Sequence, residues 1–169
     1  MTKTKIGSSA ELNENGVLLG DAPLDDAPLG DALPVDETTH FQPKWDANGL
    51  ILAIAADRID NTPLMVAYMN EEALVQTLET GEAHFYSRSR KALWHKGGTS
   101  GNVLTVHDIR VDCDQDAIWL AVEAQGHGAA CHTGRKSCFY RSLTKTDGKM
   151  RLSIEDDARL FNPDEVYNK

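Results

Sequence analysis

The sequence contains no long apolar run and little positive charge. No stretch of its 169 residues approaches the roughly 20 consecutive apolar residues that cross a bilayer. The lysines of residues 1–16 precede no apolar block of the kind that makes a secretory signal, so we expect a cytoplasmic protein without a membrane partner. Lys and Arg number 17 against 26 Asp and Glu, a net charge of −9, and this disfavours nucleic-acid binding, which needs a basic surface.

Cysteine is also scarce. The three cysteines, Cys113, Cys131 and Cys138, are an odd number in a chain with no export signal, which argues against a disulfide framework. Two alternatives remain at this point, namely buried thiols, which behave as small apolar side chains, and metal ligands.

Acidic residues are concentrated at the beginning of the chain. Residues 1–39 contain eight acidic residues and two lysines, and the pattern Asp-Ala-Pro-Leu recurs at Asp21 and Asp26. The prolines are too frequent for a helix and the apolar residues too sparse for a core. We therefore predict a flexible acidic extension over residues 1–39, a globular domain over 40–143 and a polar C-terminal extension over 144–169.

Short apolar runs dominate the globular domain and predict a mainly β (α+β) fold with one short helix. We expect strands at residues 50–56, 64–69, 83–87, 102–111, 118–124 and 138–143. The helix should begin after Asn70 as N-cap and end at Gly81. Its inward-facing stripe is predicted to be Ala73, Leu74, Thr77 and Leu78.

Three carboxylates alternate with other residues at positions 112–116. In a straight strand the outer two would lie about 13 Å apart, too far to share one ion. If the segment curls, Asp112, Asp114 and Asp116 can converge on a hard cation through oxygen, with Cys113 pointing the other way. The alternative is an exposed acidic turn, the more common setting for such residues.

A glycine-rich segment, residues 126–138, carries the other two cysteines. Cys131 and Cys138 could join Cys113 in supplying three thiolates to Zn²⁺. The fourth position would then be left for water, which is typical of a catalytic zinc site. His132 stands next to Cys131, where it could act as a general base or as a fourth ligand. The spacing does not separate these roles.

Basic and hydroxyl side chains lead into a Gly-Gly-Thr-Ser-Gly turn at residues 97–101. The backbone N–H groups of such a turn can surround an anion. Arg88, Arg90, Lys91 and Lys96 suit phosphate recognition, and Trp94 offers a stacking face for a base. The alternative is an exposed basic hairpin.

Taken in chain order, these stretches resemble the phosphoribosyl-AMP cyclohydrolase family. The matching segments are residues 69–74, 80–82, 85–90, 93–94, 96–97, 99–102, 112–116, 131–134 and 137–141, so the resemblance covers about residues 41–143. The blocks at 112–116 and 131–141 are the most specific. In one departure, Gly98 stands where many relatives have an acidic residue.

The resemblance implies an intertwined homodimer with metal sites at the subunit interface. Zinc would be held by Cys113 of one subunit and by Cys131 with Cys138 of the other. Magnesium would be held by Asp112, Asp114 and Asp116, and His132 would be catalytic or would assist a ligand.

The resemblance also implies a reaction. It is the hydrolysis of the N1–C6 bond in the adenine ring of 1-(5-phosphoribosyl)-AMP, a step of histidine biosynthesis. Some relatives carry a second, pyrophosphohydrolase domain, for which residues 144–169 are too few and too polar. The residues that we expect to bind the substrate are Arg88, Arg90, Trp94, Lys96, Thr99, Ser100 and Arg135.

Two other functions compete with this one. A zinc-dependent nucleobase deaminase would show a His-x-Glu motif and a Pro-Cys-x-x-Cys motif, and neither occurs here. A binding module would instead use three cysteines and a histidine to hold a structural zinc, with the basic hairpin contacting RNA or a nucleotide. Zinc stoichiometry together with nucleotide turnover separates the binding module from the hydrolase.

Overall fold

The computed structural model of the chain describes residues 34–167. Most of the predicted acidic extension, residues 1–33, lies outside the described residues. The described part belongs to one compact unit. Its elements are β1 (Ile51–Asp57), β2 (Pro63–Met69), α1 (Glu71–Thr80), β3 (His84–Ser87), β4 (Ala92–His95), β5 (Leu104–Val111), β6 (Ala117–Ala124), β7 (Arg141–Thr146), β8 (Lys149–Ile154) and α2 (Pro163–Tyr167).

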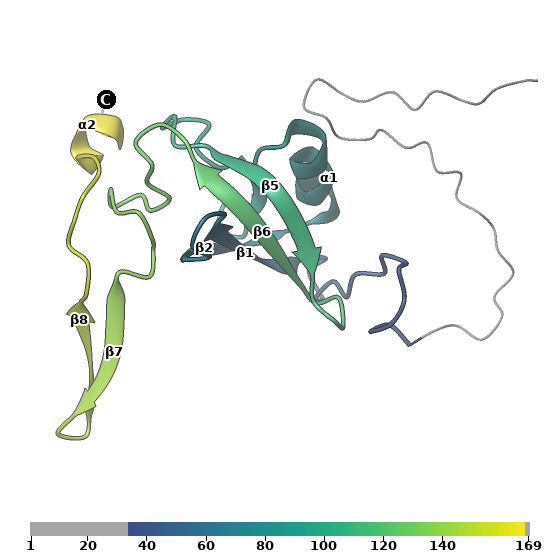
Figure 1. Ribbon diagram of the computed structural model, residues 1–169, viewed down its shortest axis with the longest axis horizontal. Coiled ribbons are helices and arrows are strands. Elements are labelled where there is room, and N and C mark those ends of the chain that lie inside the picture. Colours follow the sequence, from purple (N-terminus) through teal and green to yellow (C-terminus); the bar gives the residue numbers. More distant parts are fainter. Residues whose placement is uncertain (1–33, 168–169) are drawn as a thin grey trace, which may run out of the picture. The chain divides into compact units, whose positions relative to one another are not determined.

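Six strands form one mixed sheet in the order β4-β3-β2-β1-β6-β5 (Figure 1). Neighbouring strands are antiparallel except β1 and β6, which run parallel and join the two halves of the sheet. The mainly β prediction is therefore confirmed. Neither helix among the described residues is long and apolar enough to span a membrane.

The sheet curls so that its two ends meet. Just before β3, the Ala83 N–H donates to the Leu104 carbonyl at 2.9 Å, and the Val106 N–H donates to the Gly81 carbonyl at 2.7 Å. These bonds connect the segment before β3 to β5, the strand at the opposite edge. The concave side holds the core, whose fully buried side chains include Phe85, Leu104, Ile118, Leu120 and Val122.

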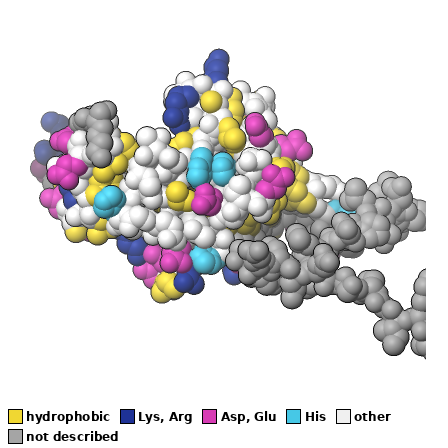
Figure 2. All heavy atoms as spheres, turned by 90° about the horizontal axis from the view of Figure 1, so that it is seen from above, with side chains coloured by type: hydrophobic (Ala, Val, Ile, Leu, Met, Phe, Trp, Pro, Cys, Tyr) yellow, Lys and Arg dark blue, Asp and Glu magenta, His cyan; other side chains and the backbone are white. Residues whose placement is uncertain are grey.

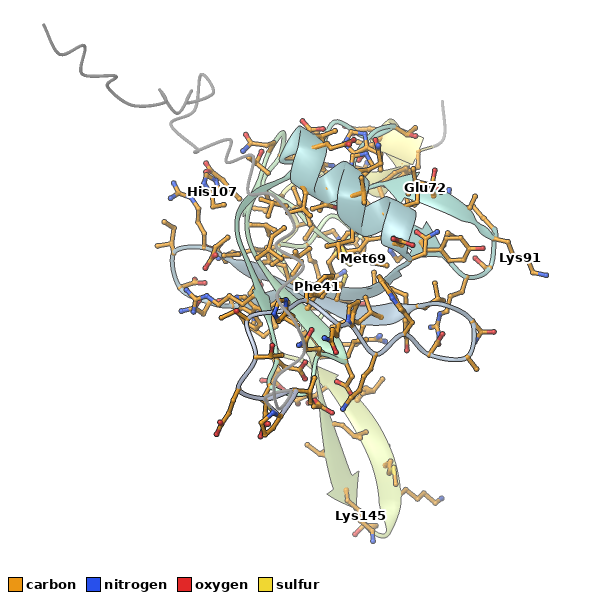
Figure 3. All side chains as sticks on the ribbon, turned by 90° about the vertical axis from the view of Figure 1, so that its right-hand side faces the viewer. Phe41, Met69, Glu72, Lys91, His107 and Lys145 are labelled. Atoms are coloured by element: carbon orange, nitrogen blue, oxygen red, sulfur yellow. The ribbon has the colours of Figure 1, made fainter. Side chains whose placement is uncertain are left out.

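Helix α1 begins and ends where the sequence predicts. The Asn70 side chain accepts a hydrogen bond from the Ala73 N–H at 3.0 Å, and Gly81 ends the helix in the left-handed conformation with φ 68°. In Figure 3 the helix lies over the strands with Met69 beneath it. The prediction for Leu78 is wrong, since this side chain is 64% exposed. It lies about 100° around the helix from buried Thr77 and so falls outside the buried stripe.

Three elements were not predicted, namely β4, β8 and α2. The last strand also begins at Arg141 rather than at Cys138, because residues 138–140 form a connection after the glycine-rich loop. Strand β7 runs across residue 143, where we expected the domain to end, and pairs with β8 over its full length. Residues 144–154 are therefore part of a hairpin, whose far end is marked by Lys145 in Figure 3.

The β7–β8 hairpin has one polar face and one face on which four apolar side chains lie together with Arg141 and Lys145. Leu143 is opposite Leu152, and the flanking pairs place Met150 and Ile154 on the same face. All four apolar side chains are exposed, from 57% for Ile154 to 77% for Met150. The other face carries Ser, Thr, Lys and Arg side chains. We refer to Leu143, Met150, Leu152 and Ile154 below as the apolar hairpin face.

Candidate functional site

A pocket of about 380 Å³ opens at the end of β4, beside the glycine-rich turn. Seven of the fourteen residues expected at the site line this pocket. They are Arg90, Trp94, Lys96, Thr99, Ser100, His132 and Cys138. Segments around residues 94–100 and 130–138 thus meet in space, as expected if both serve one site.

The turn that forms one wall of the pocket depends on close backbone packing. Gly97 has φ +85°, and a Cβ there would lie 2.2 Å from the Asn102 carbonyl carbon, so only glycine fits. Asn102 is buried and its Oδ1 accepts the His127 N–H at 2.9 Å. These contacts fix the backbone of residues 97–102, which positions the Thr99 and Ser100 side chains at the pocket.

Lys96 is buried beneath this turn. Its Nζ lies 3.4 Å from the Asn102 carbonyl oxygen. Desolvation lowers the pKa of the ammonium group, and negative charge on Cys138 and Cys131 would raise it. Lys96 is thus placed to balance charge on the two cysteines, in addition to lining the pocket.

Cys131 and Cys138 lie next to each other. Cys131 is buried, with Sγ 3.0 Å from the Thr133 hydroxyl, and the Cys138 N–H donates to the Leu64 carbonyl at 2.8 Å. Although the Cys138 residue has much of its surface exposed, its thiol faces the pocket beside Cys131. Desolvation, followed by the charge of Cys131, raises the pKa of the Cys138 thiol to about 12. Two thiolates this close require a cation, and paired soft sulfur ligands suit Zn²⁺.

Cys113 lies in a different place, in the turn between β5 and β6. It is exposed and borders a second pocket with Asp112 and Gln115. Among residues 34–167 of a single chain, the three cysteines do not form a group close enough to share one metal ion. One chain by itself thus contributes two adjacent thiols and one separate thiol.

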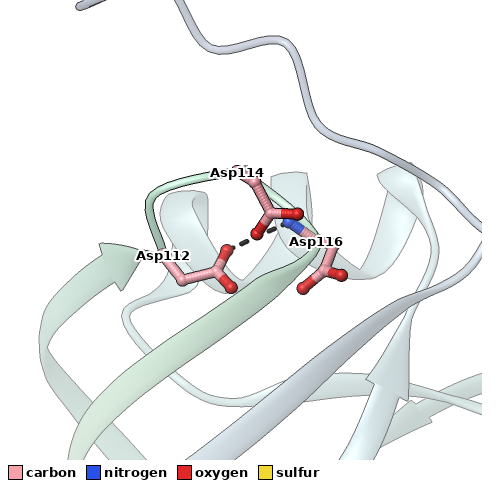
Figure 4. A group of neighbouring side chains, drawn as sticks. All are labelled: Asp112, Asp114 and Asp116. Atoms are coloured by element: carbon pink, nitrogen blue, oxygen red, sulfur yellow. Dashed lines mark hydrogen bonds between the residues drawn. The ribbon is translucent and has the colours of Figure 1, made fainter. Parts of the chain in front are cut away.

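The aspartates of the β5–β6 turn do converge, as the curled-segment interpretation predicts. Ligand oxygens of Asp112, Asp114 and Asp116 all lie within 4.8 Å of one another (Figure 4). The curl is made by Gln115, with φ +60°, and by Asp112 Oδ1, which accepts the N–H groups of Asp116 and Ala117, each at 3.0 Å.

The three carboxyl groups differ in their electrostatics. The charge of Asp114 raises the pKa of Asp116. At Asp112 desolvation opposes ionisation, but hydrogen bonds from the backbone of Ala117 and Asp116 outweigh it and lower the pKa. Crowded carboxylate oxygens of this kind fit a hard divalent cation such as Mg²⁺.

A segment before β1 is fastened to this aspartate turn through Gln115, a residue the sequence analysis did not single out. The buried Gln115 side chain accepts the Gln42 N–H at 2.6 Å and donates to the His40 carbonyl at 3.1 Å. The Lys44 N–H bonds to the Gln115 carbonyl at 2.7 Å. These contacts are separated by more than 70 residues in sequence, so no local pattern could reveal them.

Two of the arginines expected to bind substrate have internal partners instead. Arg88 stacks on the Tyr68 ring at 4.0 Å and does not line the pocket. Arg135 is buried, pairs with the Asp157 carboxylate and lies 4.1 Å from the centre of the Tyr140 ring. Because its guanidinium is held from both sides, Arg135 supports the loop between the two cysteines.

Two polar side chains of the pocket were missed. Tyr167 reaches the pocket from α2, near the end of the described chain. His95 stands between Trp94 and Lys96, both singled out from the sequence, but nothing in the local pattern indicated a role for it.

Comparison with known proteins identifies the chain. The family model described as phosphoribosyl-AMP cyclohydrolase matches residues 65–140, which include the pocket's main walls and the aspartate turn. A phosphoribosyl-AMP cyclohydrolase of Rhizobium etli is 54% identical over 142 residues, 84% of this chain and 95% of the relative. Those of Sinorhizobium medicae and Nitrobacter winogradskyi are 58% identical over 127 residues and 57% identical over 133. They cover 75% and 78% of this chain, and 84% and 90% of the respective relatives.

Similarity of this extent first establishes the class of protein, because the matched region contains most of the pocket. The chain is an enzyme. More specifically, it belongs to the phosphoribosyl-AMP cyclohydrolase family.

Proposed function

We propose that this enzyme hydrolyses the N1–C6 bond in the adenine ring of 1-(5-phosphoribosyl)-AMP, opening the purine ring in histidine biosynthesis. The observation that carries the proposal is the 54% identity to the Rhizobium etli cyclohydrolase over 95% of its length. The pocket supports it, because basic, hydroxyl and aromatic side chains around 380 Å³ suit a phosphorylated nucleotide.

Substrate binding is assigned to the side chains that face the pocket. Arg90 and the Gly97–Ser100 turn offer positive charge, hydroxyl groups and backbone N–H donors for a phosphate. Trp94 offers a ring face for the base or ribose. The local positive charge explains how a chain of net charge −9 binds a substrate with two phosphates.

The reaction adds one water across one bond. Substitution at N1 makes the protonated adenine ring cationic and C6 electrophilic. The water oxygen bonds to C6, and the electron pair of the broken C6–N1 bond moves to N1. If the substrate is taken in its neutral form, with an imino group at C6, one water proton ends on this exocyclic nitrogen and completes a carboxamide. The other water proton ends on N1. His132, exposed at the pocket, is proposed to move one of these protons.

Zinc is the metal that we assign to the thiols. Cys131 and Cys138 fit two of its ligands because their thiols contact each other and Cys138 lines the pocket. Zn²⁺ supplies Lewis-acid chemistry that makes hydroxide available near neutral pH. Cys113 is the proposed third ligand, and its separate position in one chain requires that it come from a second copy.

The proposed second copy makes the enzyme a homodimer. Its support is the apolar hairpin face, because four exposed apolar side chains on one face of a two-stranded ribbon need a cover. A dimer that covers this face and shares zinc ligands is obligate, because each site is incomplete in a single chain.

Magnesium is proposed for the aspartate turn. Asp112, Asp114 and Asp116 provide only oxygen ligands. Mg²⁺ prefers oxygen ligands, whereas the zinc site proposed above uses thiolates. The aspartates thus serve a second metal, whose role we assign to binding of a substrate phosphate or ribose.

A zinc-supplemented assay of the purified full-length chain with phosphoribosyl-AMP tests the proposal. We expect an absorbance change as the ring opens, loss of turnover with a zinc chelator, and recovery when zinc is added back. If the chain binds zinc stoichiometrically but never turns over this substrate, the zinc is structural and the binding-module alternative replaces the hydrolase.

A further inference from the structure

A histidine and a carboxylate pair at the wall of the pocket. His95, the last residue of β4, places Nε2 2.7 Å from Oε2 of Glu82, which precedes β3. This nitrogen is buried and has no other polar partner among the described residues. The contact lies outside hydrogen-bond geometry, and a small rotation of the carboxylate would turn it into a hydrogen bond. On the face drawn in Figure 2, histidine side chains lie together beside an acidic side chain.

The ring of His95 is held in place from a second side. It stacks on His84 with ring centroids 4.5 Å apart and an interplanar angle of 11°. His84 is itself buried, and its Nδ1 lies 2.9 Å from the Glu82 carbonyl oxygen. One carboxylate and one stacked ring therefore fix the position of the His95 imidazole.

The other nitrogen of His95 faces the pocket side. A Cβ on Gly98 would lie 3.0 Å from His95 Nδ1, so this nitrogen borders the Gly97–Ser100 turn. His95 and Gly98 both line the pocket. Because Gly98 has no side chain, nothing on that residue covers the imidazole.

We propose that His95 is an acid–base residue of the ring-opening reaction and that Glu82 is its positioning residue. The inference rests on the proposed function. A carboxylate at Nε2 favours a proton on that nitrogen, so proton exchange with a bound molecule takes place at Nδ1. It also stabilises the imidazolium form, as the carboxylate does in a carboxylate–histidine pair of a hydrolase.

The proton transfer assigned to His95 occurs as the C6–N1 bond breaks. The imidazolium gives its Nδ1 proton to N1 while the electron pair of the broken bond moves to N1. The C6 hydroxyl loses its proton as the carbonyl forms, and that proton returns to Nδ1. His95 therefore ends the cycle in its starting state, and no other reactant is required.

Other titratable groups lie around His95 at the same pocket. Glu82 and His84 contact the ring, while Lys96, Arg90, His132, Cys138 and Tyr167 line the pocket around it. Among residues 34–167, Glu82 is the carboxylate that contacts the imidazole, so Glu82→Gln removes this contact specifically.

The test compares His95→Asn and Glu82→Gln with the wild-type chain in the phosphoribosyl-AMP assay. We expect His95→Asn to lower kcat by about 10²- to 10⁴-fold, the usual contribution of a general acid or base, with KM changed little. In the wild type, kcat should fall as rising pH deprotonates the imidazolium. This decrease of kcat at high pH should be absent in His95→Asn. Glu82→Gln should also lower kcat, by less than His95→Asn does and with KM changed little, since the amide no longer holds the proton on Nε2.

A second histidine–glutamate pair provides a matched control. His107 Nε2 lies 3.1 Å from Glu123 Oε2. The side chains of this pair are 39% and 45% exposed, and those of His95 and Glu82 are 37% and 41% exposed. This pair does not line the pocket. His107→Asn and Glu123→Gln should therefore leave kcat and its pH profile unchanged, while circular dichroism and melting curves report on folding of all four variants.

Each outcome decides the question. If His95→Asn has the kcat and the pH profile of the wild type, the acid–base role is refuted. A defect confined to KM would make His95 a binding residue instead. If His95→Asn fails to fold, Glu82→Gln decides, and a wild-type kcat in that variant refutes the inference. No turnover by the wild type would overturn the proposed function itself, which is a different result.

Discussion

Lys44 Nζ lies 3.2 Å from Asp114 Oδ2, so a residue near the beginning of the domain places a positive charge beside the aspartate turn. The contact is half-exposed on both sides, at 52% and 47%. One of the three carboxylates therefore contacts a positive charge that the chain itself supplies.

The first prediction is that Lys44 competes with Mg²⁺. In Lys44→Gln the affinity for Mg²⁺ should increase by up to about fivefold, since an exposed ion pair contributes about 0.2–1 kcal/mol. Calorimetric Mg²⁺ titration measures the change. Lys145→Gln, at the tip of the hairpin, is the control and should have the wild-type affinity. Equal affinity in Lys44→Gln would show that Mg²⁺ does not use Asp114.

The second prediction concerns the thiols. Cys113→Ala, Cys131→Ala and Cys138→Ala should each lose zinc and turnover together, because each removes one of three ligands. Mixed Cys113→Ala and Cys131→Ala chains should recover part of the activity, since one site of a mixed dimer keeps all three cysteines. Metal analysis and the ring-opening assay provide the measurements. Full zinc content in any single variant would remove that cysteine from the ligand set.

The third prediction uses the two faces of the hairpin. Leu152→Ser should shift the chain toward monomers, because Leu152 belongs to the apolar hairpin face opposite Leu143. Arg151→Ser changes the neighbouring residue on the polar face and should leave the dimer intact. Sedimentation velocity over a range of dilutions distinguishes the two. A Leu152→Ser chain that sediments as the wild type does would place the dimer contact elsewhere.

The fourth prediction is a pH dependence of stability at Asp60. Hydrogen bonds from Thr62, first from its side chain and then from its backbone, lower the pKa of Asp60 from 3.8 to about 2. A carboxyl group whose pKa is lower in the folded state than in the unfolded state stabilises the fold at pH values above its unfolded-state pKa. This stabilisation is lost as the pH falls through the folded-state pKa. Asp60→Asn should therefore melt below the wild type at pH 7, and the difference should vanish near pH 2. Melting curves across this range check it, and a constant difference would contradict it.

Local signals in the sequence were sufficient for most of the sheet and for α1. Asn70 and Gly81 are capping residues whose effect depends only on neighbours in the chain, and both act as predicted. The curl of the aspartate turn was one of two alternatives, and the sequence could state only that the three carboxylates share a cation if the segment curls. Strand β4 was missed because Ala92–His95 is short and continues a stretch that reads as basic loop.

Long-range contacts account for what the sequence did not reveal at the site. Arg135 reads as a substrate ligand, whereas its partners Asp157 and Tyr140 are recognisable only after the chain folds back. Glu82 and His95 are thirteen positions apart, and only the antiparallel pairing of β3 with β4 brings them together. The Gln115 contacts to His40 and Gln42 depend in the same way on the folded path.

The parallel pairing of β1 with β6 has a consequence for how the chain folds. Leu52 pairs with Ala117 and Asp57 with Val122, so this contact closes a loop of about 65 residues, and closure entropy grows with loop length. The pairs β1–β2, β3–β4 and β5–β6 are joined by short connections and can form independently. We therefore expect the rate-limiting step of folding to be the docking of β6 onto β1, with the hairpins already present.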